Sequence, residues 1–120
     1  MSPTACLRLG AALAGLAVAL GAFAAHGLKD HLEPTALETF QTGVRYQTWH
    51  ALAIVLCAAL GDRRRTGPAA VSFAVGILLF SGSLYGLALA ELRWLGPVTP
   101  FGGLAFLVGW LLLAFAKAAR

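Results

Sequence analysis

The residues of this chain best suited to proton transfer are its three histidines, His26, His31 and His50. A histidine can act as a general base near neutral pH, and Tyr85 or Arg45 could then stabilise developing charge. The histidines are poorly spaced as metal ligands, because no two of them stand four residues apart on one helical face. The sequence also contains no phosphate-binding loop, nucleotide fingerprint or nucleophile elbow. We therefore expect no metal site and no cofactor.

Polar faces on two apolar segments indicate where a site could form. Gln47 and His50 share one helical face of the second apolar segment. Ser81 and Tyr85 lie one helical turn apart in the third. Because a polar group in lipid is costly unless it faces the protein interior, both faces should point inward. We expect these four residues to form one hydrogen-bonded cluster, in which His50 has either a structural or a functional role.

Composition places the chain among membrane proteins. Of its 120 residues, 59% are apolar and 12% are charged, and the mean hydropathy is +0.79. Soluble domains are usually about half apolar and about a quarter charged, so too few charges remain here to solvate a globule. The net charge of +4 does not indicate a nucleic-acid partner, because only Arg63, Arg64 and Arg65 form a basic cluster. We expect one membrane domain covering residues 1–120.

Four segments are long and apolar enough to cross a bilayer, which takes about 20 residues of helix. Between the first two, Glu33-Pro34-Thr35 is typical of a helix start. The first segment ends in Ala22-Phe23-Ala24, which resembles a signal-peptide cleavage site, but its apolar stretch is long for a signal core. We predict an all-α bundle of four transmembrane helices, with a short amphipathic interfacial helix between the first two. The predicted spans are residues 9–25, 42–60, 69–90 and 100–116.

The distribution of lysine and arginine predicts the orientation of these spans. Six of them fall on the side that holds both termini, and three fall on the other side. Both termini should therefore be cytoplasmic. The helical rise then gives each polar side chain a depth in the bilayer, and most of these side chains lie at the bilayer midplane or on its outer side. We expect an outward-facing polar cavity above an apolar floor.

Three further features leave alternatives open. Arg45 could extend to the outer surface, pair with a loop carboxylate, or bind an anionic ligand group. Cys6 and Cys57 are too few for a disulfide framework, and we expect them to be small buried residues. Small residues at helical spacing could pack helices within one bundle or join copies of the chain, and we expect a homo-oligomer. The pairs are Gly10 and Ala14, Gly15 and Ala19, Gly82 and Gly86, and Gly102 and Gly109.

Several motifs along the chain resemble a known family. They are GAFAAHGL at residues 21–28, FQTGVRYQ at 40–47, HAL at 50–52, SGSLY at 81–85, TPFGG at 99–103 and GW at 109–110. This order is similar to the transmembrane protein 256 family, whose bacterial members are YgdD-like inner-membrane proteins of unknown function. Ala24 stands where the pattern suggests glycine, which bears only on the tightness of one helix contact. The resemblance implies a four-span bundle in the bacterial inner membrane and no assigned reaction.

The motif residues of that family coincide with the polar residues that the depth argument places in the outer half. Together with Tyr46 they form our candidate ligand-binding set. The set is His26, Gln41, Arg45, Tyr46, Gln47, His50, Ser81, Ser83, Tyr85 and Thr99.

Three kinds of function are compatible with this pattern. We expect a non-enzymatic module that binds, or helps to transport, a small polar solute or a lipid in the outward-facing cavity. The alternatives are a membrane-embedded enzyme that uses a histidine as general base, and a structural or assembly subunit of a membrane complex. The expected partners are the lipid bilayer, a lipid or small polar ligand, and other copies of the chain.

Overall fold

The computed structural model describes residues 1–119, most of which lie in helices. No strand is found within that range, so the predicted all-α class is confirmed. Two of the long helical segments contain a turn of π-helix, η1 after α1 and η2 between α3 and α4. The elements are α1 Pro3–Phe23, η1 Ala24–Leu28, α2 Pro34–Leu60, α3 Gly67–Gly76, η2 Ile77–Ser81, α4 Gly82–Ala90, the 3-10 turn η3 Arg93–Leu95, and α5 Thr99–Ala114.

Three of the helical segments are both long and apolar enough to cross a membrane. They are Pro3–Leu28, Gly67–Ala90 and Arg93–Ala114, and they correspond to the first, third and fourth predicted spans. Helix α2 is long enough, at 27 residues, but its first half carries charged and polar side chains such as Glu38 and Arg45. Length and composition therefore identify three spans among residues 1–119.

Proline begins the long helices, because its fixed φ suits a first turn and its missing N–H is not needed there. The start predicted at Pro34 is the observed start of α2. From there the helix runs without a break to Leu60, so the expected short interfacial helix is the first part of α2 and not a separate element. Prolines occupy the first or second position of α1, α2, α3 and α5, at Pro3, Pro34, Pro68 and Pro100.

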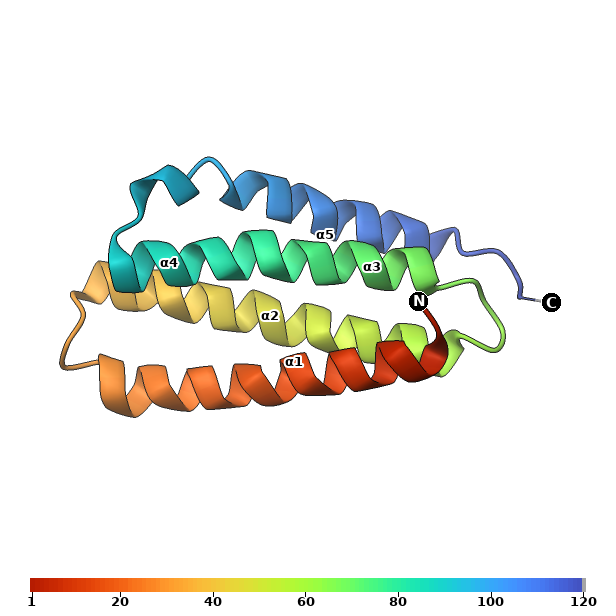
Figure 1. The fold of residues 1–120 in the computed structure, drawn as a ribbon, viewed down its shortest axis with the longest axis horizontal. Coiled ribbons are helices and arrows are strands. Elements are labelled where there is room, and N and C mark those ends of the chain that lie inside the picture. Colours follow the sequence, from red (N-terminus) through yellow and green to blue (C-terminus); the bar gives the residue numbers. More distant parts are fainter. Residues whose placement is uncertain (120) are drawn as a thin grey trace.

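The helices pack around a central pair. Helix α2 lies along α3, η2 and α4, and these segments occupy the middle of the molecule (Figure 1). Helix α1 packs along α2 and barely touches α3, whereas α5 packs along α3 and η2. The outline of the Cα trace is correspondingly flat, 52 × 27 × 17 Å. The centre of the protein is therefore the close-packed α2–α3 interface, and any hollow must lie beside α1 or α5.

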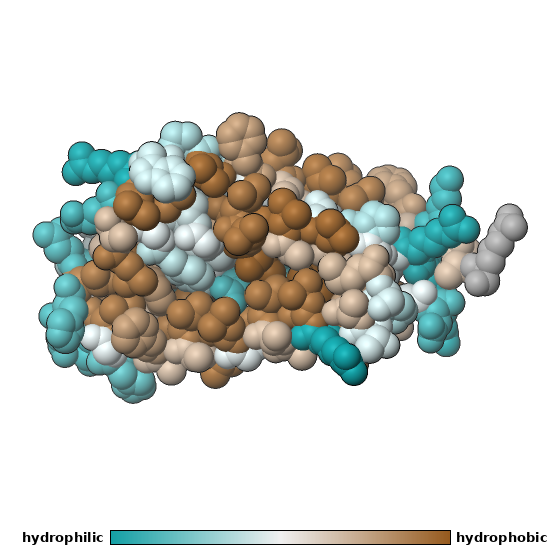
Figure 2. All heavy atoms as spheres, in the orientation of Figure 1, coloured by the Kyte–Doolittle hydropathy of each residue, from teal (hydrophilic) through white to brown (hydrophobic). Residues whose placement is uncertain are grey.

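The surface has the distribution of side chains that a membrane protein needs. Hydrophobic side chains cover most of the middle of the face in Figure 2, and the most hydrophilic ones gather toward the two ends. Val18 on α1 and Leu78 on η2 are 73% and 72% exposed. Such large apolar surfaces are costly in water but match the hydrocarbon of a bilayer. The predicted burial of Cys6 and Cys57 is confirmed, and both thiols are free.

Glycine allows a close backbone contact between α5 and η2. A Cβ atom at Gly102 would lie 2.3 Å from the backbone nitrogen of Phe80, so no larger residue fits without moving the helices. Gly10 and Gly109 also meet neighbouring helices of the same chain. A Cβ at Gly15 or Gly82 would instead meet no atom within 4 Å. Most of the small-residue positions thus pack within one chain, and a homo-oligomer stays a prediction.

Candidate functional site

Gln47 links three helical segments at the middle of the protein. Its side chain is only 2% exposed. The amide nitrogen donates a hydrogen bond to the carbonyl of Leu13 on α1, at 2.8 Å. The amide oxygen accepts one from the Tyr85 hydroxyl on α4, at 2.7 Å. A buried amide is stable only when its polar atoms are paired, so these contacts hold α1 and α4 against α2.

Ser81 and Gly43 support the same contact from one turn away. The Ser81 hydroxyl donates to the Gly43 carbonyl at 2.7 Å and is fully buried. The ring of Tyr85 lies so close that a Cβ atom at Gly43 would be 2.7 Å from its Cε1 atom. The ring also packs against Phe40, with centroids 4.9 Å apart. Of the four residues expected to form one cluster, Gln47 and Tyr85 are hydrogen-bonded to each other, whereas Ser81 bonds to the backbone of Gly43 beside them.

His50 faces another helix and makes its hydrogen bonds there. Its Nδ1 atom lies 2.7 Å from the Tyr46 carbonyl, which can only accept, so Nδ1 carries the proton. The Nε2 atom then accepts a hydrogen bond from the indole N–H of Trp110 on α5, at 3.1 Å. The ring stacks on Phe106 with centroids 3.6 Å apart. Both ring nitrogens are engaged with Tyr46 and Trp110, so His50 does not join Gln47, Ser81 and Tyr85 in the expected four-residue cluster.

Trp110 is the site residue that the sequence analysis missed. In the sequence it stands out only within the family motif at residues 109–110, because tryptophan in an apolar helix usually serves packing. A signal is nevertheless present, because an indole N–H in an apolar helix needs an acceptor and His50 is a buried polar side chain of α2. Phe106 lies one turn earlier on the same helix and covers the imidazole.

Ser83, in the first turn of α4, and Thr99 form a separate pair. Their hydroxyl oxygens are 2.5 Å apart, and the Ser83 hydroxyl also contacts the Phe80 carbonyl at 2.8 Å. The pair joins α4 to the first turn of α5 across the connection that contains η3. Both residues belong to the predicted set, but the structure gives them a role in closing this connection and does not bring them to Gln47.

The remaining members of the predicted set lie toward the surface. Arg45 donates to Glu38, with Nη2 and Oε1 2.6 Å apart, and both side chains are largely exposed. Of the three alternatives for Arg45, the structure therefore shows the carboxylate pair. His26 is exposed, Gln41 is half-buried, and the half-buried ring of Tyr46 packs on Phe80 with centroids 4.6 Å apart. None of these four is part of the group around Gln47.

A groove with a volume of about 260 Å³ runs between α1 and the α3–η2–α4 segment, with Gln47 and Tyr85 contributing its polar groups. It exists because α1 packs on α2 and leaves a gap to α3. The exposed side chains of Leu16 and Leu78 are part of its lining, so it opens sideways at mid-length and not at one end of the molecule. The other lining residues are Leu9, Leu13, Ala74, Ile77 and Gly82. Among residues 1–119, no group of three or more histidine, cysteine or carboxylate side chains could hold a metal ion.

Comparison with known proteins identifies the family of the chain. Residues 20–103 match the family described as "Protein of unknown function (DUF423)". The chain belongs to the DUF423 family. This stretch contains every predicted site residue from His26 to Thr99, but it ends before Trp110. No solved structure matches this DUF423 chain.

Three relatives of this DUF423 protein are named as membrane proteins. The chain is 43% identical over 113 residues to UPF0382 membrane protein YwdK of Bacillus subtilis strain 168, covering 90% of this chain and 91% of that one. It is 48% identical over 102 residues to a UPF0382 membrane protein of Haemophilus influenzae, covering 83% and 82%. It is 46% identical over 107 residues to UPF0382 inner membrane protein YgdD of Escherichia coli K12, covering 86% and 82%. The expected kinship with bacterial YgdD-like proteins is confirmed.

Proposed function

We propose that this DUF423 protein crosses the bacterial inner membrane four times, with both termini in the cytoplasm. Helix α2 packs along both α1 and α3, so it must cross where they cross. Its 27 residues reach about 40 Å at 1.5 Å per residue, enough for a bilayer. Two of its polar side chains, Gln47 and His50, are buried inside the protein. The strongly basic end holds both termini, which supports a cytoplasmic location for them.

In this arrangement the groove beside α1 is the best candidate for a binding site. The observation that carries the proposal is that Tyr85 and Gln47, hydrogen-bonded to each other, are the polar residues lining an otherwise apolar groove. Tyr85 uses its proton to donate to Gln47, so its oxygen keeps a lone pair for a hydrogen-bond donor. An apolar lining cannot replace the water around a small polar solute, which favours a lipid over such a solute. The function is the non-enzymatic binding of a lipid that carries a free hydroxyl group.

A histidine-based enzyme has less support from the geometry. A general base needs a lone pair within reach of substrate. Nε2 of His50 already accepts from Trp110, and Phe106 covers the ring. Assembly with a second copy has one favourable observation, the open surface at Gly15 on α1. That surface carries no group that would select a partner, so the groove remains the stronger candidate.

A matched pair of ligands tests the proposed binding directly. Purified protein is titrated with hexadecanol and with its methyl ether, which has the same chain but no donor, and binding is followed by native mass spectrometry. We expect the alcohol to bind about fivefold more tightly, the value of one net hydrogen bond. Tyr85→Phe should remove this preference, because the accepting oxygen is gone.

The groove itself is tested by filling it. Gly82 lines the groove, and a Cβ there meets no atom within 4 Å, so Gly82→Phe should fold and should abolish binding of both ligands. Gly15→Phe is the matched control, since it places the same ring on the open face of α1 outside the groove. Equal binding by the two variants, or equal affinity for alcohol and ether in the unmodified protein, would overturn the proposal.

A further inference from the structure

The basic end of the protein is built from two segments that are far apart in the sequence. The backbone N–H of Arg65 donates to the Lys117 carbonyl at 2.8 Å, and that of Ala119 donates to the Arg63 carbonyl at 2.9 Å. Arg64 and Ala118 form an antiparallel bridge between these two hydrogen bonds. The chain after α5 is thereby paired with the loop between α2 and α3. Lys117 is brought next to the three arginines.

This paired loop and tail carry a strong positive charge on a fixed support. Asp62 is the only acidic residue in the sequence of the 61–66 loop and the 115–119 tail. The Arg63, Arg65 and Lys117 side chains are exposed. The loop is anchored by the buried hydroxyl of Thr66, which donates to the Cys57 carbonyl at 2.6 Å. The positive charges are thus held at one end of the helices, where the phosphates of a bilayer lie.

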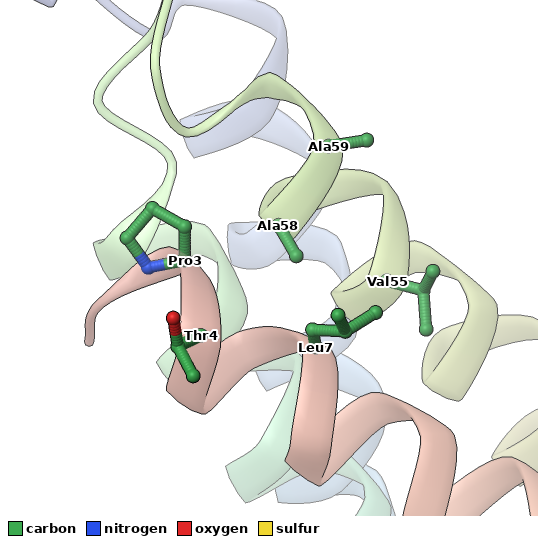
Figure 3. A pocket seen from close by; sticks show the side chains of 6 residues that line it. All are labelled: Pro3, Thr4, Leu7, Val55, Ala58 and Ala59. Carbon is green, nitrogen blue, oxygen red and sulfur yellow. The ribbon is translucent and has the colours of Figure 1, made fainter.

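An apolar groove reaches the same end of the molecule. It lies between the first turns of α1 and the last turns of α2, and it has a volume of about 260 Å³ (Figure 3). Gly61 follows directly after α2, and a Cβ atom there would lie 2.6 Å from Cγ of Pro3, so the loop leaves α2 beside the end of the groove. Leu7 is half exposed, which opens the groove to surrounding lipid. The lining side chains are Pro3, Thr4, Leu7, Val55, Ala58 and Ala59.

We propose that this groove and the adjoining basic residues form a binding site for an acidic phospholipid. One acyl chain lies in the groove, and the phosphate lies against Arg63, Arg65 and Lys117. Charge complementarity selects an anionic headgroup, because basic side chains at a membrane surface attract acidic lipids. The apolar groove selects a lipid over a soluble anion, which would gain nothing from it. The site lies at the opposite end of α1 from η1 and shares no lining residue with the groove at Gln47.

The charge requirement is tested with two lipids that have the same acyl chains. The full chain is reconstituted in nanodiscs, and retention of phosphatidylglycerol is compared with that of phosphatidylcholine by native mass spectrometry. Each arginine near an anionic surface strengthens binding about fivefold, so Arg63→Gln with Arg65→Gln should reduce the phosphatidylglycerol preference about 30-fold. The matched control, Lys29→Gln with Arg93→Gln, removes two exposed charges from the other end and should leave the preference unchanged. A preference that is absent from the unmodified protein, or reduced equally by both pairs, would overturn the proposal.

The groove requirement separates a lipid from a soluble anion. Ala59 is exposed on the groove wall, so Ala59→Phe should fold and should reduce retention of phosphatidylglycerol about tenfold, whereas Ala22→Phe on α1 should not. Inorganic phosphate should fail to displace the bound lipid, and complete displacement would assign the site to soluble anions instead. Gly82→Phe should leave this binding intact, so failure here and failure of the hydroxyl-lipid site can be told apart.

Discussion

The indole N–H of Trp110 donates a hydrogen bond to Nε2 of His50 across the gap between α5 and α2, at 3.1 Å. Phe106 stacks on the same imidazole, so α5 is attached to α2 through side chains although its backbone packs mainly on α3 and η2. This contact determines the protonation pattern of His50, with the proton on Nδ1 and the lone pair on Nε2. It makes His50 a structural link between helices.

Trp110→Phe should therefore destabilise the protein beyond the loss of packing. The change leaves Nε2 of His50 buried without a donor, which costs about 1–3 kcal/mol. His50→Leu should remove much of this penalty, so the double variant should be more stable than the sum of the single changes predicts. Chemical unfolding in detergent measures all three. Strictly additive effects would show that the two rings are not coupled.

Gln47→Leu should be among the more destabilising polar-to-apolar changes in the chain. It leaves the Tyr85 hydroxyl without its acceptor and the Leu13 carbonyl without its additional donor, at a cost of about 1–3 kcal/mol. Thr48→Val is the control, because its hydroxyl bonds only to the Val44 carbonyl of its own helix, where the bond adds little. Thermal unfolding of the two variants in the same detergent should separate them clearly. Similar midpoints would contradict the linking role of Gln47.

Gly102→Ala should weaken the packing of α5. The added methyl group would lie 2.3 Å from the Phe80 backbone nitrogen, and overpacking of this kind typically costs about 1–3 kcal/mol. Gly15→Ala is the matched control, because its methyl group meets open space, and alanine favours a helix by about 0.5–1 kcal/mol over glycine. The two substitutions should thus shift the unfolding midpoint in opposite directions. If both substitutions shift the unfolding midpoint by the same amount in the same direction, helix propensity alone accounts for their effect on stability.

The proposed orientation can be tested with single cysteines in a background where Cys6→Ala and Cys57→Ala remove the native thiols. Asp30→Cys should react with a membrane-impermeant thiol reagent in intact cells, because the 29–33 turn lies at the end away from both termini. Arg64→Cys should react only after the inner membrane is opened. Leu78→Cys should react poorly in both cases, since its exposed side chain faces lipid. Labelling of position 64 in intact cells would show that the orientation is opposite to the proposed one.

Much of the fold was predictable from local features of the chain. The apolar composition indicated a membrane protein, and Pro34 marked where α2 begins. Helical periodicity correctly placed Gln47 and His50 on the buried face of α2. These features depend on one helix at a time and on the solvent around it, so the sequence by itself determined them.

The tertiary structure alone decided which helix each of those faces meets. Gln47 and His50 are three residues apart, yet one bonds to α1 and α4 and the other to Trp110, sixty positions along the chain. The tail after α5 likewise pairs with Arg63 and Arg65, a partner that its local sequence does not indicate. Helical spacing specifies a direction around one axis but not the neighbour that lies there. That neighbour is chosen by close packing between helices, as at Gly102, where the missing side chain lets α5 approach the backbone of Phe80.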